Sequence, residues 1–84
     1  MDPDTLKTRL LSLLTSVAPD IEPQSLDPDR ALRDQFDFDS MDTLHFAAAV
    51  SEAFHVPIAE TEYSKLAGIG AAADFIRSKL TQAV

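Results

Sequence analysis

Apolar residues recur along this chain at the spacing of an α-helix, and no segment of useful length shows the alternation of a half-buried strand. The first stripe consists of Leu6, Leu10, Leu13, Leu14 and Val17. Asp2 followed by Pro3 is a typical helix start. Pro19 ends this helix near Val17 or Ala18. This periodicity predicts an all-α fold.

A second helix is predicted from about Ser40 to Phe54 or His55, with Asp39 as its N-cap. Asp42 lies three residues after this cap, so the pair resembles a capping box with aspartate in place of glutamate or glutamine. The stripe expected to be buried consists of Thr43, Phe46, Ala47, Val50 and Phe54.

Two further helices complete the predicted architecture. A short one is expected from Glu60 to Leu66, and a final one from about Ala71 to Leu80, after the two glycines of the chain. A loop of about twenty residues, Pro19 to Asp39, separates the first two helices, and its scattered apolar residues indicate that it packs on the core. We therefore expect a single domain over residues 1–84, a small four-helix bundle with a long first loop and a short third helix.

Charge and composition narrow the possible functions. A net charge of −7 and a pI near 4.4 argue against nucleic acid and anionic membrane surfaces, and favour basic protein surfaces as partners. The chain has no cysteine, and His45 and His55 lack a paired histidine, so we expect no metal site. The acidic N-terminus lacks a secretory signal and no segment reaches transmembrane length. A cytoplasmic monomer is therefore expected.

The most distinctive local motif is Asp37-Phe38-Asp39-Ser40-Met41-Asp42, directly before the second helix. No histidine or lysine lies near Ser40 in sequence to activate its hydroxyl, so the chain is not expected to be an enzyme. The first turn of a helix has unpaired N–H groups and a positive dipole end, which favour a phosphodiester on this hydroxyl. We interpret Ser40 as a hydroxyl that another enzyme modifies. The simpler alternative is that Ser40 and Asp39 only cap the helix.

Over nearly all of its length the chain resembles the acyl carrier protein family. The family has an Asp-Ser-Leu-Asp-like motif at the start of the second of four helices, which reads Asp39-Ser40-Met41-Asp42 here. The segment Glu52-Ala53-Phe54-His55-Val56-Pro57-Ile58 is similar to the Glu-x-Phe-x-x-x-Ile segment of the family. Further residues in family register are Leu66, Ile69, Asp74, Phe75 and Ile76. The resemblance implies that a phosphopantetheinyl transferase attaches 4′-phosphopantetheine from coenzyme A to Ser40, between Asp39 and Met41.

The same resemblance implies a free-standing carrier that holds acyl intermediates as thioesters. It would deliver them to acyl-ligase, synthase or acyltransferase enzymes in fatty-acid, lipid or polyketide-type biosynthesis. The residues expected to contact partners are Asp37, Asp42, Leu44, His45, Ala48, Glu52 and Glu60. His45 and Ser51 stand where fatty-acid members usually have glutamates, which favours a specialised carrier over the housekeeping one.

The interior of the chain suggests a site for the acyl group. Runs of alanine at Ala47–Ala49 and Ala71–Ala73 reduce side-chain volume where such carriers can enclose an acyl chain. We hypothesise an acyl pocket bounded by Phe46, Phe54, Leu66 and Phe75. Close packing of the helices is the simpler explanation of the alanines. Met41 and Leu44 are either core residues or face the arm and the partners.

Two alternatives remain at this point. One is a carrier of an amino acid: D-alanyl carriers share Met41 but have glycine at the position of Asp42, and peptidyl carriers usually have glycines where Phe38 and Asp39 stand. The other is a carrier-shaped domain that is never modified and acts as a protein-interaction module. The intact Asp-Ser-Met-Asp motif argues against this second alternative.

Overall fold

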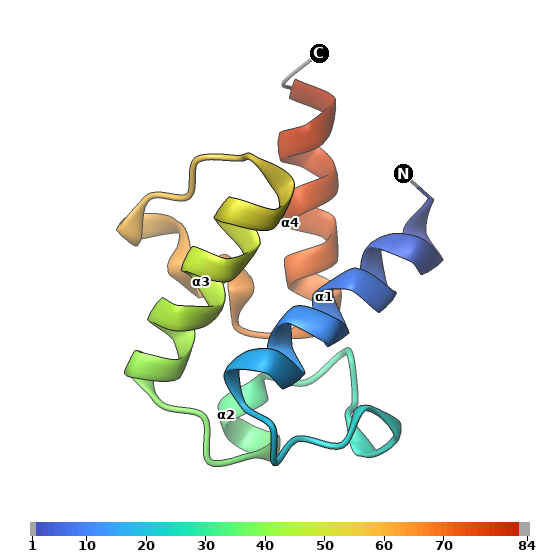
Figure 1. The fold of residues 1–84 in the computed structure, drawn as a ribbon, viewed down its shortest axis with the longest axis vertical. Helices are drawn as coiled ribbons and strands as arrows, with labels where there is room; N and C mark the ends of the chain where they lie inside the picture. Colours follow the sequence, from blue (N-terminus) through green and yellow to red (C-terminus); the bar gives the residue numbers. More distant parts are fainter. Residues whose placement is uncertain (1, 83–84) are drawn as a thin grey trace.

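The computed structural model describes residues 2–82, and every regular element within them is helical (Figure 1). In chain order the elements are α1 (Pro3–Val17), η1 (Pro23–Ser25), α2 (Leu32–Gln35), α3 (Ser40–Phe54), η2 (Glu60–Leu66) and α4 (Ile69–Gln82), where η marks a 3₁₀ helix. The predicted all-α bundle is confirmed, with η2 as the short third helix and with η1 and α2 inside the long loop. None of the helices in this part of the chain could cross a membrane.

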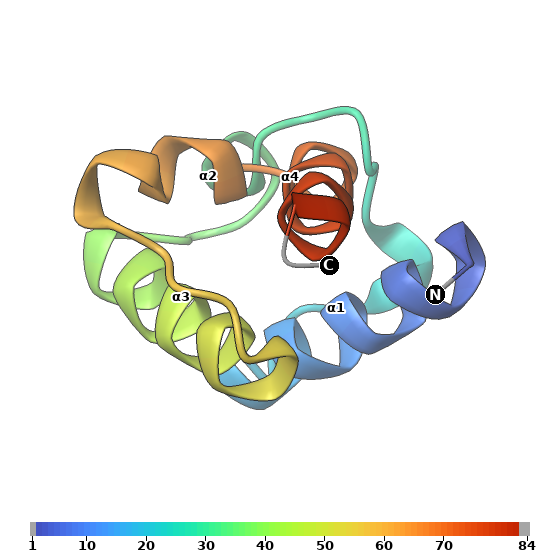
Figure 2. The same ribbon diagram turned by 90° about the horizontal axis from the view of Figure 1, so that it is seen from above.

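The helices enclose one apolar core. α1 packs against α3 and α4, and η2 packs against α3 and α4, so that α4 lies between α1 and η2 in the end-on view of Figure 2. The buried side chains are Leu6, Leu10, Leu14, Ile21, Leu32, Phe38, Phe46, Ala47, Val50, Phe54, Val56, Leu66, Ile69, Ala72, Ala73 and Ile76. Thr43, which was expected to be buried, is partly exposed. Leu13, Val17, Phe75 and Leu80 pack against the core and also remain partly exposed.

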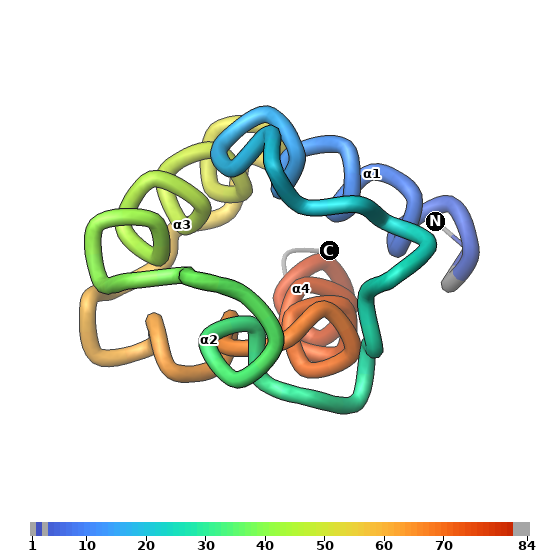
Figure 3. Tube along the Cα trace, turned by 90° about the horizontal axis from the view of Figure 1, so that it is seen from below, coloured from blue at the N-terminus to red at the C-terminus, as the bar shows by residue number. Residues whose placement is uncertain are grey.

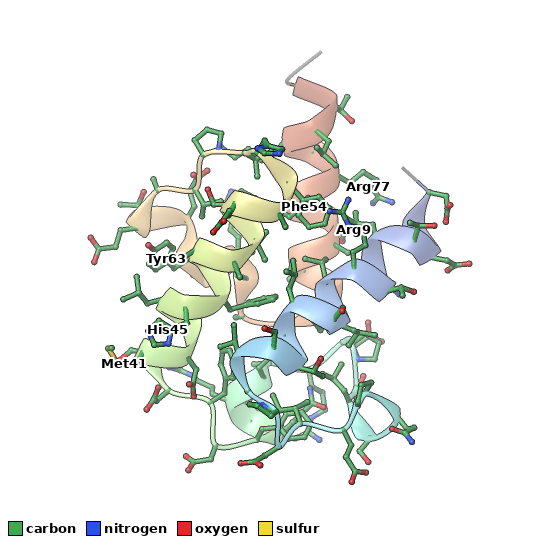
Figure 4. The ribbon with its side chains drawn as sticks, viewed as in Figure 1. Arg9, Met41, His45, Phe54, Tyr63 and Arg77 are labelled. Atoms are coloured by element: carbon green, nitrogen blue, oxygen red, sulfur yellow. The ribbon has the colours of Figure 1, made fainter. Side chains whose placement is uncertain are left out.

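A cation–π contact joins α1 to the end of α3. The guanidinium of Arg9 lies 4.4 Å from the centroid of the Phe54 ring. The same side chain donates a hydrogen bond to the carbonyl oxygen of Ala53 at 3.3 Å. Figure 4 shows Arg9 and Phe54 side by side at this junction. These two contacts hold the C-terminal end of α3 against α1.

The long loop is held against the start of α4, at the end of the molecule that faces the viewer in Figure 3. Two main-chain hydrogen bonds connect them: Leu32 N–H donates to Ala67 O at 2.7 Å, and Gly70 N–H donates to Pro28 O at 2.9 Å. Ile21, Leu32 and Phe38 enter the core from this loop. The expectation that the loop packs on the core is confirmed.

The start of α4 differs from the prediction. We expected this helix from about Ala71, but it begins at Ile69, so Gly70 lies in its first turn. A Cβ atom at Gly70 would lie 2.7 Å from Pro28 O, and neither glycine has a positive φ. Gly70 is therefore suited to a close approach of the loop backbone rather than to a break in the helix.

Candidate functional site

The N-terminus of α3 is capped by its own side chains. Asp39 Oδ1 accepts a hydrogen bond from Asp42 N–H at 3.0 Å, and Asp42 Oδ2 accepts one from Asp39 N–H at 3.2 Å. The Thr43 hydroxyl adds a bond to Asp39 O at 3.2 Å. The predicted capping box is confirmed, and it is complete without Ser40.

Ser40 is the first residue of α3, and its side chain is exposed. Within residues 2–82 its hydroxyl has no hydrogen-bond partner. Because Asp39 and Asp42 already satisfy the cap, the alternative in which Ser40 serves only as a capping residue loses its support. The hydroxyl is free to react and lies at the positive end of the helix dipole.

A groove begins at Ser40 and runs between α2, α3 and η2. It consists of two adjoining hollows of about 260 and 400 Å³. The smaller hollow contains Ser40 and Asp39 in its lining, and the larger one extends to Ala31, Asp34, Ser64 and Ala67. Both are lined by Arg33, Phe38, Thr43 and Tyr63. We call this combined depression the Ser40 groove.

The η2 wall of the Ser40 groove is fixed by Glu62. Its carboxylate accepts a hydrogen bond from Ala59 N–H at 3.0 Å and pairs with Lys79 of α4 at 3.1 Å. The Ala59 hydrogen bond, followed by the contact with Lys79, holds the pKa of Glu62 below its usual value. Tyr63, the next residue, lies beside α3 (Figure 4).

The outer face of α3 carries most of the residues expected to contact partners. Met41 is 56% exposed and Leu44 is 41% exposed, so these two residues are not part of the core. Met41 and His45 project away from the molecule (Figure 4). The exposed positions Met41, Leu44, His45, Ala48 and Glu52 follow one another at helical spacing. Of the remaining predicted positions, Asp37 and Glu60 are exposed on the flanking segments and Asp42 is partly buried.

The four residues of the hypothesised acyl pocket lie in or against the packed core. Phe46, Phe54 and Leu66 are buried, whereas Phe75 is partly exposed. The Phe75 ring has the ammonium groups of Lys65 and Lys79 at 5.7 and 5.5 Å from its centroid. None of the four lines the Ser40 groove. An acyl pocket among them stays a prediction that requires these side chains to move apart.

Sequence reasoning missed the residues that form the Ser40 groove. Arg33, Phe38 and Tyr63 come from separate segments, and only the fold brings them together. Tyr63 carried a weak signal as the single tyrosine of the chain. No sequence pattern distinguished Arg33. Among the described residues no cluster of metal-ligating side chains is present.

An exposed serine at a capped helix start, beside an open groove in a small helical bundle, defines a class of carrier domain. The chain matches the family model described as "Phosphopantetheine attachment site" over residues 8–76, which is well over half of its length. It therefore belongs to this family and is a phosphopantetheine carrier of the acyl carrier protein type. No curated protein matches the sequence.

Members of this family carry covalently attached 4′-phosphopantetheine and interact with phosphopantetheinyl transferases and synthase enzymes. The surroundings of Ser40 fit such a group. Its hydroxyl is exposed and has no hydrogen bond, the groove beside it is open, and Arg33 offers a cation for a phosphate. When bound, the group supplies a terminal thiol on which a thioester can form.

Proposed function

We propose that Ser40 is the attachment site and that the protein carries acyl groups as thioesters in fatty-acid, lipid or polyketide-type biosynthesis. The observation that carries this proposal is the exposed Ser40 hydroxyl, left free by a cap that Asp39 and Asp42 complete. Ser40 also lies within the matched range, residues 8–76. The chain contributes the hydroxyl and the surface that partner enzymes recognise.

The loading reaction is a phosphoryl transfer onto Ser40. The oxygen of Ser40 attacks the pantetheine-side phosphorus of coenzyme A, and a new O–P bond forms. The bond from this phosphorus to the bridging oxygen breaks, and adenosine 3′,5′-bisphosphate leaves with the bond's electrons. The hydroxyl proton goes to a base of the transferase. Asp39 Oδ1 accepts the Asp42 N–H and so holds the start of α3 on which Ser40 lies.

The outer face of α3 is the surface that we assign to the transferase and to the acyl-handling enzymes. It presents Met41 and Leu44 beside the attachment residue, with His45 and Ala48 along the same face. Asp42 and Glu52 are the only acidic residues of α3, and the helix contains no lysine or arginine. A contact surface with few charges favours fast dissociation, which a carrier needs because it must leave each partner enzyme quickly.

Intact mass spectrometry after incubation with coenzyme A, magnesium and a broad-specificity phosphopantetheinyl transferase tests the attachment site. We expect wild type to gain one phosphopantetheine and Ser40→Ala to gain none. Ser64→Ala is the matched control, because Ser64 is another exposed serine on the Ser40 groove, and it should load like wild type. Loading of Ser40→Ala, or no loading of a folded wild-type protein, would contradict the proposal.

The class of cargo is tested on protein isolated from its native cell. Hydroxylamine cleaves the thioester, and mass spectrometry of the released hydroxamate identifies the group that was carried. We expect an acyl hydroxamate without an α-amino group. An aminoacyl hydroxamate would instead establish the amino-acid carrier.

A further inference from the structure

Arg33 is the one basic side chain that lines the Ser40 groove, and it lines both of its hollows. Within the described residues the structure gives its guanidinium no hydrogen bond and no ion pair. Most other basic side chains are engaged: Arg9 with Ala53 O and the Phe54 ring, Arg30 with Asp34 O, Arg77 with Asp74, Lys79 with Glu62, and Lys65 with the Phe75 ring.

The carboxylates along the same groove form no ion pair with Arg33 within the described residues. Asp39 lines the smaller hollow, but its Oδ1 holds the N–H of Asp42. Asp34 lines the larger hollow and is exposed, and it forms no ion pair with Arg33 in the described residues. The guanidinium is therefore available to an anion that enters the groove from the Ser40 end. Its planar array of donors matches a phosphate group well.

We propose that Arg33 is a positioning residue that binds the phosphodiester of the arm on Ser40 and directs the arm into the Ser40 groove. This inference rests on the proposed attachment at Ser40. The phosphate is the part of the arm nearest to its point of attachment, and Arg33 and Ser40 line the same hollow of about 260 Å³. The alternative course for the arm runs over the exposed outer face of α3.

The rest of the groove suits the chemistry of the pantetheine portion, which alternates methyl and methylene groups with amides and a hydroxyl. Phe38 and Tyr63 offer aromatic surface along the groove. The hydroxyls of Thr43, Tyr63 and Ser64 offer hydrogen-bonding groups. An arm in the groove keeps its thiol close to the carrier.

The test compares apo and fully loaded protein by amide ¹H–¹⁵N NMR, with intact mass confirming the loading. In wild type we expect loading to shift the amides at the attachment point and those of Tyr63, Ser64 and Ala67 across the groove. In Arg33→Gln the shifts at Met41 and Asp42 should remain, whereas those across the groove should shrink by about two- to fivefold. Arg33→Lys, which keeps the charge and loses the planar donors, should give intermediate shifts.

Arg30→Gln is the matched control. Arg30 lies three residues before Arg33, ahead of α2, and lines a neighbouring hollow beside Pro28, Gly68 and Gly70 but not the Ser40 groove. The loaded Arg30→Gln protein should therefore show the same groove shifts as wild type.

A second readout is the reaction rate of the arm thiol with a disulfide reagent. An exposed ion pair changes the equilibrium between an arm in the groove and an arm in solvent by about two- to fivefold. The thiol of loaded Arg33→Gln should therefore react faster than that of wild type by about this factor.

The outcomes separate the two proposals. A loaded Arg33→Gln protein whose groove shifts equal those of wild type, or a loaded wild type without groove shifts, overturns the role of Arg33 and leaves the attachment at Ser40 intact. A wild-type protein that gains no arm overturns the proposed function, and this inference with it.

Discussion

The N-termini of α3 and α4 differ in the groups that accept hydrogen bonds from their first N–H groups. Each helix must satisfy the N–H groups of its first turn. At α3 the carboxylates of Asp39 and Asp42 do this, and Ser40 is left exposed. At α4 the N–H of Gly70 donates to the carbonyl of Pro28, which brings the loop backbone so close that a methyl group at Gly70 would collide with it.

The difference shows what makes a helix start usable as an attachment site. A cap made from local side chains leaves solvent access to the first residue of the helix. A cap made from a distant main-chain segment closes that access. Ser40 therefore has the open surroundings that the proposed attachment requires, whereas Gly70 cannot accept a single methyl group without rearrangement.

The largest expected effect on stability comes from Gly70→Ala. The new methyl group would lie 2.7 Å from Pro28 O, a backbone atom that cannot turn aside. We expect a loss of about 1–3 kcal/mol in the free energy of unfolding, measured by urea titration. Gly68→Ala, whose methyl would lie 3.0 Å from Arg30 O, should lose less. A Gly70→Ala protein as stable as wild type would show that the two helix starts do not differ in this way.

The next effect is that of Asp39→Ala, which removes the local cap of α3. Without the Asp39 carboxylate the Asp42 N–H loses its partner, and we expect unfolding to require about 1 kcal/mol less. Asp39→Asn keeps an oxygen acceptor and should stay close to wild type in the same urea titration. An unchanged urea midpoint for Asp39→Ala would mean that the side-chain cap does not hold this helix start.

Ser40→Ala should change stability very little. The Ser40 hydroxyl has no hydrogen bond in the described residues, and its side chain is exposed, so the free energy of unfolding should stay within about 0.5 kcal/mol of wild type. The unmodified proteins are compared by urea titration. A clear loss of stability would give the hydroxyl a structural role and would weaken the contrast between the two starts.

The smallest effect is a pH dependence at a third helix start, that of α1. Asp2 accepts hydrogen bonds from the N–H of Thr5 at 3.0 Å and from its hydroxyl at 2.8 Å. These bonds, with the backbone N–H first, hold the pKa of Asp2 below its usual value. The folded state therefore gains stability from the Asp2 carboxylate above its unfolded pKa of about 4 and loses it as the pH falls through the lowered pKa.

Asp2→Asn isolates this contribution, because asparagine caps a helix without titrating. We expect the difference in urea midpoint between wild type and Asp2→Asn to be constant near pH 7 and to move against wild type below about pH 4. Glu62 titrates in the same direction, but it is present in both proteins and cancels in the comparison. A difference that stays constant down to pH 3 would contradict the role of Asp2.

The parts of the fold that depend on local chemistry were predictable. Asp2 with Pro3 placed the start of α1, and Asp39 with Asp42 placed the start of α3, because a cap is formed by residues that are close in sequence. The start of α4 was predicted two residues late, because the role of Gly70 depends on the carbonyl of Pro28 in the distant loop.

The candidate site was likewise predictable only where its residues are close in sequence. The motif around Ser40 and the helical spacing along the outer face of α3 were visible in the sequence. The Ser40 groove was not, since Arg33, Thr43 and Tyr63 share a hollow only after α2, α3 and η2 have packed. The attachment at Ser40 and the acyl pocket stay predictions until they are measured.

The two hydrogen bonds between the loop and α4 affect which residues of the loop can vary in sequence. Leu32 N–H to Ala67 O and Gly70 N–H to Pro28 O join main-chain atoms: every residue has the carbonyl oxygen, and every residue other than proline has the N–H. Exposed side chains of the loop can therefore be replaced without breaking these two hydrogen bonds. The surface charge of this loop can therefore vary while the two hydrogen bonds, and the position of the loop against α4, stay the same.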